Sequence, residues 1–323
     1  MNCKHITAAL CLAALALAAC KKDKDVSFPD LGGSLSFKAP YVVGAGDVLT
    51  LEPYGVYHPD GGNVGYVWYS SLDIAVRDTT RYENDPLSVK GTFTYVVPDQ
   101  LETFYINCIA FAKGYSSSYC SRQVTVVGPS SISYDGEVLP VEDDILDEDG
   151  VQYNVADAGG GLSWLMSNLM NPSSGRSFED CQAADYSIGR FYTAAEAATA
   201  CPSGWRLPTL EEWKGLCGGA FEGAAGSLMG DAMLNGDILW AYSKDVRITN
   251  STRLSALPSG YATISESGDY VFSGRLNYAA FWCSDSTTEG DTYVYINRNS
   301  PDVYVGYATP DRFALTVRCV KEN

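Results

Sequence analysis

The sequence predicts two domains, an all-β sandwich followed by an α+β domain. Short alternating segments between turn residues fill residues 34–127, and helical patterns join the strands in residues 147–323. A chain of 323 residues is long enough for two domains of ordinary size. Its hydrophobic content of 46% is typical of packed globular protein, which argues against a disordered chain.

Residues 1–19 have the composition of a secretory signal peptide. Lys4 provides a positive start, and residues 6–19 are apolar apart from Thr7. This run is shorter than the roughly 20 apolar residues of a membrane-spanning helix. It ends in the letters LAAC at residues 17–20, which resemble the lipobox of bacterial lipoproteins. The alternative is an ordinary signal peptide beside a cysteine that carries no lipid.

The lipobox resemblance implies a lipid anchor on Cys20, followed by a charged tether over residues 20–33. One acyl chain binds a membrane only marginally, whereas two signals together bind it stably. Lys21, at the second mature position, resembles lipoproteins that are sent to the outer membrane. We therefore expect an outer-membrane lipoprotein at the cell surface, with the periplasmic face as the alternative.

Charge and histidine content disfavour several classes of function. A formal net charge of −17 disfavours nucleic acid, because binding phosphates requires a basic surface. His58 is the one histidine beyond the predicted signal, and no Cys/His cluster has the spacing of a metal site. Motifs of nucleophilic, phosphate-binding and dinucleotide-binding enzymes are missing, although carboxylate pairs alone leave glycoside hydrolysis open. We expect no cofactor, no metal and no enzymatic activity.

The first domain is predicted over residues 34–127 from short β-branched and aromatic segments between turns. These expected strands cover residues 35–37, 48–51, 64–69, 92–97, 104–112 and 119–127. The strand with Trp68, the strand with Phe104 and the Gly114-Tyr115 turn before the last strand resemble, in layout, a PKD-type or other immunoglobulin-like domain.

Cys108 and Cys120 are expected to face each other in this sandwich. A three-residue hairpin loop at residues 113–115 places them directly opposite, on the same inward face as Ile106 and Val124. They then form either a cross-strand disulfide or two buried thiols, and a two-residue loop would break the register.

Residues 128–146 are expected to link the domains, because Gly128-Pro129-Ser130 starts this segment with turn residues. The acidic residues at 142–149 lack the regular spacing of a calcium loop. We interpret them as a solvated acidic segment.

The second domain, residues 147–323, is predicted to be α+β. Helices are expected over residues 193–200 and 209–216, the second with Thr209 and Glu212 as a capping box. Leu210, Trp213 and Leu216 then share one face of that helix. Later strands are expected at residues 280–282, 292–296, 303–307 and 314–320.

A series of phrases in this domain resembles one family. The most specific is CPSGWRLPT at residues 201–209, and the others lie at residues 149–153, 164–169, 189–193, 257–261, 281–284 and 317–321. In this order they resemble the FISUMP family, the major paralogous domain of fibre-degrading and gut bacteria, over about residues 145–323. The Gly-rich stretch before Trp164 departs from the family pattern.

The resemblance implies a fold similar to the C-type lectin-like fold, a compact unit whose termini meet. It also implies a disulfide between Cys201 and Cys319, with two separate buried thiols as the alternative. Cys181, Cys217 and Cys283 leave one more pairing open. We expect Arg206 and Arg318 to pair with carboxylates or carbonyls rather than to bind a ligand.

The sugar-binding motifs of calcium-dependent lectins are absent, so a calcium-free glycan site is the remaining lectin-type hypothesis. Trp240, Tyr242, Tyr270 and Tyr278 are its candidate residues, because they fall in expected long loops, although aromatic side chains also commonly fill cores. We expect a lipid-anchored binding protein that contacts a membrane and a glycan or surface protein, for adhesion or glycan recognition. The alternatives are a subunit of a surface appendage and, third, an enzyme.

Overall fold

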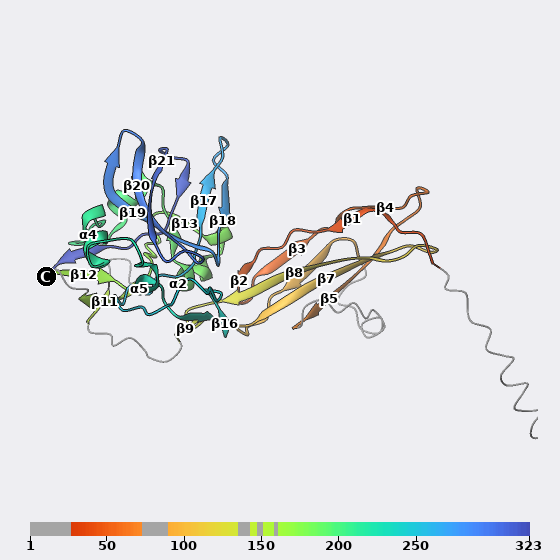
Figure 1. The fold of residues 1–323 in the computed structure, drawn as a ribbon. Helices are drawn as coiled ribbons and strands as arrows, with labels where there is room; N and C mark the ends of the chain where they lie inside the picture. The colour runs from red at the N-terminus through yellow and green to blue at the C-terminus, as the bar shows by residue number, and fades with distance from the viewer. Residues whose placement is uncertain (1–26, 73–89, 135–142, 147–150, 158–160) are drawn as a thin grey trace, which may run out of the picture.

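The computed structural model describes residues 27–72, 90–134, 143–146, 151–157 and 161–323. The predicted signal and Cys20 lie outside these residues, as does much of the acidic segment. The described protein is β-rich and consists of an elongated sandwich followed by a larger part with several small sheets and short helices (Figure 1).

The first part is built from two layers of strands. One layer is a four-stranded sheet in the order β2-β8-β7-β5, in which β2 and β8 are parallel and the other pairs antiparallel. The other layer contains the antiparallel pairs β1–β4 and β3–β6. The strands are β1 (Gly32–Ser36), β2 (Val42–Gly44), β3 (Val48–Leu51), β4 (Tyr54–Tyr57), β5 (Gly65–Ser71), β6 (Phe93–Val96), β7 (Thr103–Phe111) and β8 (Ser118–Val127).

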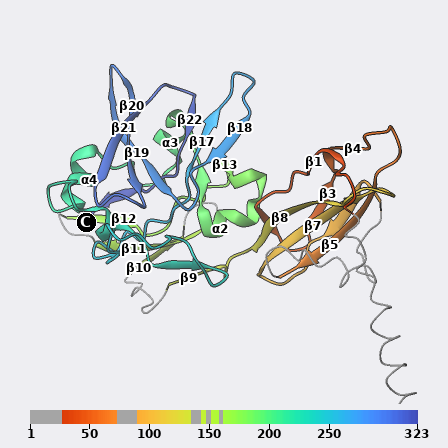
Figure 2. The same cartoon turned by 45° about the vertical axis from the view of Figure 1, so that its right-hand side comes forward.

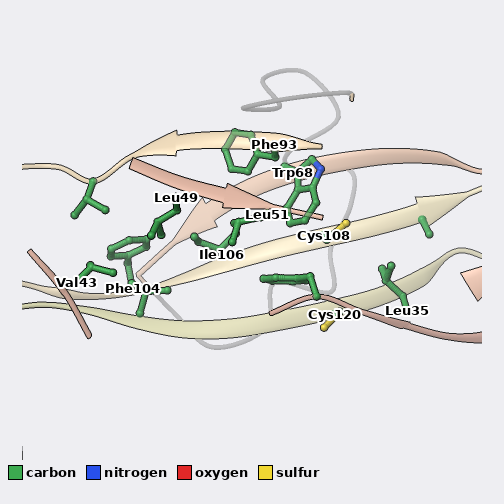
Figure 3. Packing of buried hydrophobic residues seen from close by; sticks show 14 of the residues in the cluster. Leu35, Val43, Leu49, Leu51, Trp68, Phe93, Phe104, Ile106, Cys108 and Cys120 are labelled. Atoms are coloured by element: carbon green, nitrogen blue, oxygen red, sulfur yellow. The ribbon is translucent and has the colours of Figure 1, made fainter. Parts of the chain in front are cut away.

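Aromatic and branched side chains fill the space between these layers (Figure 3). Trp68 is fully buried, stacks on Phe93 with the ring centroids 5.4 Å apart, and meets the edge of Phe37 at 5.1 Å. Its indole N–H donates to the Lys90 carbonyl at 2.9 Å, so the one polar atom of this core residue is satisfied.

The predicted register of the β7–β8 hairpin is confirmed. Cys108 lies directly opposite Cys120, and both are buried with Ile106 and Val124 in the sandwich core. Both cysteines are free thiols in this structure. Burial, with a smaller effect of neighbouring Cys120, raises the pKa of the Cys108 thiol to about 12, so this thiol stays protonated at neutral pH.

The described residues of the second part form five small sheets. Their orders are β10-β11-β12-β23, β13-β14, β16-β15-β9, β18-β17-β22 and β19-β20-β21. The strands are β9 (Ile132–Tyr134), β10 (Asp143–Leu146), β11 (Gln152–Asp157), β12 (Leu162–Leu165), β13 (Arg176–Ser177), β14 (Arg190–Phe191), β15 (Ala232–Leu234), β16 (Asp237–Ile238), β17 (Tyr261–Ile264), β18 (Tyr270–Ser273), β19 (Tyr278–Thr287), β20 (Gly290–Asn297), β21 (Val303–Ala308), β22 (Phe313–Ala314) and β23 (Val320–Glu322).

The helices of this part are short. They are α2 (Asp185–Ile188), α3 (Ala194–Ala200), α4 (Leu210–Leu216) and α5 (Ala225–Leu228), with 3-10 turns at Phe178–Asp180 and Gln182–Ala184. Thr193 and Thr209 cap α3 and α4, each in a capping box with the glutamate three residues later. Both predicted helices are therefore confirmed, and Trp213 is fully buried on the expected face of α4.

The β19-β20-β21 sheet packs against a different core on each face. Phe281 and Val294 contact one cluster, which contains Trp213 of α4, whereas Trp282 and Tyr293 belong to a second cluster with residues of α3. The period of two along each strand produces this division, because neighbouring residues point to opposite faces. This sheet therefore forms the centre of the second part and positions the candidate site.

The prediction of one continuous strand over residues 314–320 is wrong. The segment contributes β22 at its start and β23 at its end, and these strands belong to different sheets. Between them the backbone bonds to several elements, with the N–H of Leu169 donating to the Val317 carbonyl and that of Leu165 to the Cys319 carbonyl. Every residue from 314 to 320 is buried, and most of them are apolar or β-branched, which resembles a strand in the sequence alone.

The disulfide between Cys201 and Cys319 is confirmed. It joins the end of α3 to the residue before β23, across a sequence separation of 118. Because β23 pairs with β12, the last strand lies beside a strand from the early half of the second part.

The two parts share an interface at one end of the sandwich, where the 3-10 turns before α2 lie next to β2 (Figure 2). Val42 and Val127 pack there into an apolar cluster with side chains of α2 and β14. The guanidinium of Arg275 lies 3.1 Å from the centroid of the Tyr41 ring, and the Tyr41 N–H donates to Glu179 at 2.6 Å.

Candidate functional site

A hollow of about 260 Å³ lies on the face of the β19-β20-β21 sheet that α4 does not cover, on the same side as the cluster that contains α3. Tyrosine rings from β17, β19 and β20 surround it, together with Phe313 of β22. We call it the tyrosine hollow, and its lining residues are Tyr261, Tyr278, Ala280, Tyr293, Tyr295, Phe313 and Leu315.

Small residues on neighbouring strands make room for the hollow. Ala280 lies opposite Tyr295 on β19, and Gly306 lies opposite Tyr293 on β21. A Cβ atom on Gly306 would be 2.3 Å from the Tyr293 ring, so only glycine lets this ring lie across the strand. Each of these two tyrosines thus has one small neighbour across the sheet, on β19 for Tyr295 and on β21 for Tyr293.

The rings hold one another in place through edge and offset contacts. Tyr293 and Tyr295 have centroids 5.9 Å apart, and Tyr278 lies 6.4 Å from Tyr295 and 6.2 Å from Tyr261. Tyr304 stacks on Tyr295 at 5.1 Å with an interplanar angle of 20°. These separations are those of favourable aromatic pairs, so the hollow is preformed by packing.

The polar atoms of the hollow are uncharged and free. The hydroxyls of Tyr261, Tyr278, Tyr293 and Tyr295 make no hydrogen bond to any residue in the described part of the chain. Burial, and next the neighbouring tyrosines, raise the pKa values of Tyr293 and Tyr295 above that of an ordinary phenol. Tyr293 and Tyr295 therefore stay protonated at physiological pH. The lining contains no Asp, Glu, Lys, Arg or His, and the tyrosines offer O–H groups that both donate and accept.

The comparison with known families accounts for this part of the chain. The model of the Fibrobacter succinogenes major domain matches residues 158–321, just over half of the chain. The chain belongs to this family. No curated protein matches it. The matched region begins about a dozen residues later than the sequence resemblance indicated and contains the tyrosine hollow and the disulfide.

The aromatic residues predicted as one site lie in separate places of the major domain. Tyr278 lines the tyrosine hollow, whereas Tyr270 lies in β18 beneath the guanidinium of Arg176. Trp240 and Tyr242 line another hollow instead. The four residues therefore do not form one group, because Trp240 and Tyr242 lie in the irregular segment after β16, whereas Tyr270 and Tyr278 lie in β18 and β19.

Trp240 is also not an exposed loop residue. It is 3% exposed, and its indole N–H donates to the Ala256 carbonyl at 2.8 Å, whereas Tyr242 is 90% exposed. Sequence reasoning missed Tyr293 and Tyr295, although two tyrosines at alternate positions of a predicted strand indicate one aromatic face.

Arg206 and Arg318, which lie in the motifs that resemble the family, bond to other residues of the protein, as predicted. Arg206 donates to both carboxylate oxygens of Glu212, at 2.9 and 2.7 Å. Arg318 is completely buried and donates to Asn168 Oδ1 at 2.9 Å and to the carbonyls of Leu165 and Ser255.

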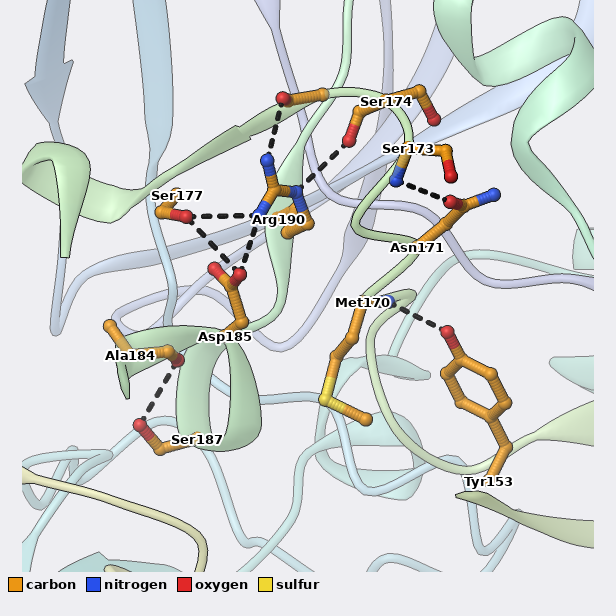
Figure 4. Close-up of polar contacts among 11 residues, drawn as sticks. Tyr153, Met170, Asn171, Ser173, Ser174, Ser177, Ala184, Asp185, Ser187 and Arg190 are labelled. Atoms are coloured by element: carbon orange, nitrogen blue, oxygen red, sulfur yellow. Dashed lines mark hydrogen bonds and ion pairs between the residues drawn. The ribbon is translucent and has the colours of Figure 1, made fainter. Parts of the chain in front are cut away.

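A third polar cluster of the major domain also serves the fold (Figure 4). Arg190 donates to Asp185 at 2.6 Å, to Ser177 Oγ at 3.1 Å and to the carbonyls of Ser174 and Gly175. Burial raises the pKa of Asp185, which the charge of Arg190 opposes. These contacts join α2 to the loop before β13, so the cluster is internal rather than aimed at a ligand.

The described residues contain no group of metal-binding side chains that could hold an ion. No helix among them has the length and apolarity to cross a bilayer.

Proposed function

We propose that this protein is a lipid-anchored cell-surface binding protein that recognises an uncharged glycan in the tyrosine hollow. The sandwich is an immunoglobulin-like spacer in this proposal, and the major domain is a C-type lectin-like unit. The observation that carries the proposal is a preformed hollow lined by four tyrosines with free hydroxyls and by no charged described residue.

The chemistry of the hollow matches that of a sugar. A sugar ring presents C–H faces, which pack on aromatic rings, and hydroxyls, which exchange hydrogen bonds with phenols. Because the lining is neutral, it provides no opposite charge that would stabilise a bound acidic or basic ligand. The volume of about 260 Å³ is just below that of drug-sized sites, which favours recognition of one sugar residue at a time.

The arrangement of the chain supports the remaining parts of the proposal. Two strand layers over one core support the immunoglobulin-like spacer. The pairing of β12 with β23 supports a lectin-like unit whose ends meet. The lipobox letters before Cys20 support the anchor.

A glycan array with the soluble chain, residues 21–323, tests the proposal. We expect binding to neutral glycans and a loss of about tenfold, ~1.4 kcal/mol, in Tyr295→Ala, because a stacking ring is removed. Tyr307→Ala is the matched control, since Tyr307 is an exposed tyrosine of β21 that does not line the hollow.

Tyr295→Phe separates the two contributions, because it keeps the ring and removes the hydroxyl, and we expect an intermediate loss. Circular dichroism checks that each variant is folded. Silence of the wild-type chain on all neutral glycans, or equal binding by Tyr295→Ala, would contradict the proposal.

A further inference from the structure

A larger hollow, of about 520 Å³, lies elsewhere on the major domain and differs in charge from the first. Three basic and two acidic side chains line it, together with hydroxyl, aromatic and aliphatic side chains. We call it the basic hollow, and its main lining residues are Trp240, Tyr242, Ser243, Arg247, Ile248 and Arg298.

Arg298 in its wall is an arginine without a counter-charge. Its side chain is half-buried, and its Nε atom is buried without a hydrogen-bond partner. No carboxylate among the described residues pairs with Arg298 or with Arg247, which lines the same hollow. Buried polar groups in native proteins are almost always satisfied, so the unpartnered Nε is an exception. Because this atom is buried, the two Nη groups of Arg298 are the donors left to meet a ligand.

Four other arginines of the major domain are paired with carboxylates, whereas Arg318 donates to Asn168 and to backbone carbonyls and Arg275 lies over the Tyr41 ring. Arg176, Arg190, Arg206 and Arg312 each form an ion pair with a carboxylate. The whole chain carries a net charge of −17, so carboxylates are abundant. Arg247 and Arg298 share this hollow without a carboxylate partner among the described residues, although carboxylates outnumber basic groups in the chain.

The remaining charges of the basic hollow leave a local positive excess. Lys244 and Asp245 neutralise each other at 2.8 Å, and Asp231 contributes one carboxylate against the two arginines. The sign of the charge here is thus opposite to that of the whole protein.

We propose that the basic hollow binds a carboxylate-bearing sugar residue, of the uronic-acid class. The planar guanidinium of Arg298 matches a carboxylate in two parallel hydrogen bonds, with Arg247 as a second cation. The sugar body lies against Tyr242, which is 90% exposed, and meets the hydroxyls of Tyr242 and Ser243. This site is separate from the tyrosine hollow and does not depend on neutral-glycan binding there.

Titration of the soluble chain, residues 21–323, with D-glucuronate, followed by saturation-transfer NMR, tests this inference. D-glucose is the matched probe without the carboxylate. We expect glucuronate to bind and Arg298→Gln to weaken it at least tenfold, with a smaller loss of two- to threefold in Arg247→Gln. Arg312→Gln, which removes an exposed arginine outside the hollow, is expected to leave the affinity unchanged.

Several outcomes would overturn the proposal: no glucuronate binding, wild-type affinity in Arg298→Gln, or displacement of glucuronate by equal concentrations of acetate or sulfate. The last would mean an unspecific anion site. Tyr295→Ala is expected to keep glucuronate binding, so failure at one hollow is distinguishable from failure at the other. An unchanged melting temperature of Arg298→Gln shows that the loss is not one of folding.

Discussion

At the scale of single residues, Arg318 is a charged side chain in the core of the major domain. It is fully buried, with its guanidinium 5.6 Å from the Phe281 centroid. Burial lowers its pKa to about 9, which still leaves it charged at neutral pH. Asn168 and two backbone carbonyls replace the water that this charge loses.

Replacing Arg318 with methionine is expected to destabilise the fold by about 3 kcal/mol, because three buried acceptors lose their donor. Urea unfolding followed by tryptophan fluorescence measures this change. Arg312→Met is the matched control, since Arg312 is half-exposed and 3.8 Å from Glu266, and we expect a change of about 0.5 kcal/mol or less. Equal effects of the two variants would show that the buried contacts do not stabilise the protein.

The sequence predicted that Arg318 is paired within the fold, but it did not predict that Trp240 is buried. Arginine carries a charge that must be matched wherever it is buried, so pairing is a safe expectation. Tryptophan is compatible with a core, a loop or a binding surface, and its burial beside Ala256 depends on a distant segment. The free hydroxyls of the tyrosine hollow depend on three strands meeting, which no local pattern contains.

At the scale of elements, local signals predicted the helices and the long hairpins well. Capping boxes and loop length are short-range features, so α3, α4 and the β7–β8 register follow from a few residues each. The short strands β2 and β4 were missed, and the break between β22 and β23 as well, because long-range pairing decides them. The Cys201–Cys319 pair was implied by family resemblance and not by spacing.

The disulfide is expected to stabilise the major domain by about 4–5 kcal/mol in the chain-entropy model, because it closes a loop with a sequence separation of 118. The double variant Cys201→Ser/Cys319→Ser, compared with wild type in urea unfolding, measures this contribution. Cys217→Ser is the control, since Cys217 is a free thiol of the same domain. A midpoint unchanged from wild type in the double variant would contradict the expectation.

At the scale of the whole molecule, the proposal places a binding domain at the far end of a spacer. The apolar interface around Val42 and Val127, and the contact of Arg275 with Tyr41, join the two parts directly. The sandwich therefore does more than tether the major domain, because it contributes side chains to their common core. The anchor itself lies outside the described residues.

Labelled palmitate is expected to enter the wild-type protein and not Cys20→Ser, because that thiol is the proposed acylation site. Membrane fractionation of the same cells is expected to move the variant from the membrane to the soluble fraction. Cys108→Ser serves as the control for loss of an unrelated cysteine. Label in Cys20→Ser equal to that in the wild type would rule out this anchor.

The most direct measurement of the central claim is an NMR titration of the soluble chain, with labelled tyrosines, against a neutral glycan selected on the array. We predict that ring signals of Tyr261, Tyr278, Tyr293 and Tyr295 shift together with one affinity. Signals of buried Tyr153 and exposed Tyr242 are expected to stay unchanged. Saturable shifts confined to tyrosines outside the hollow would contradict the account.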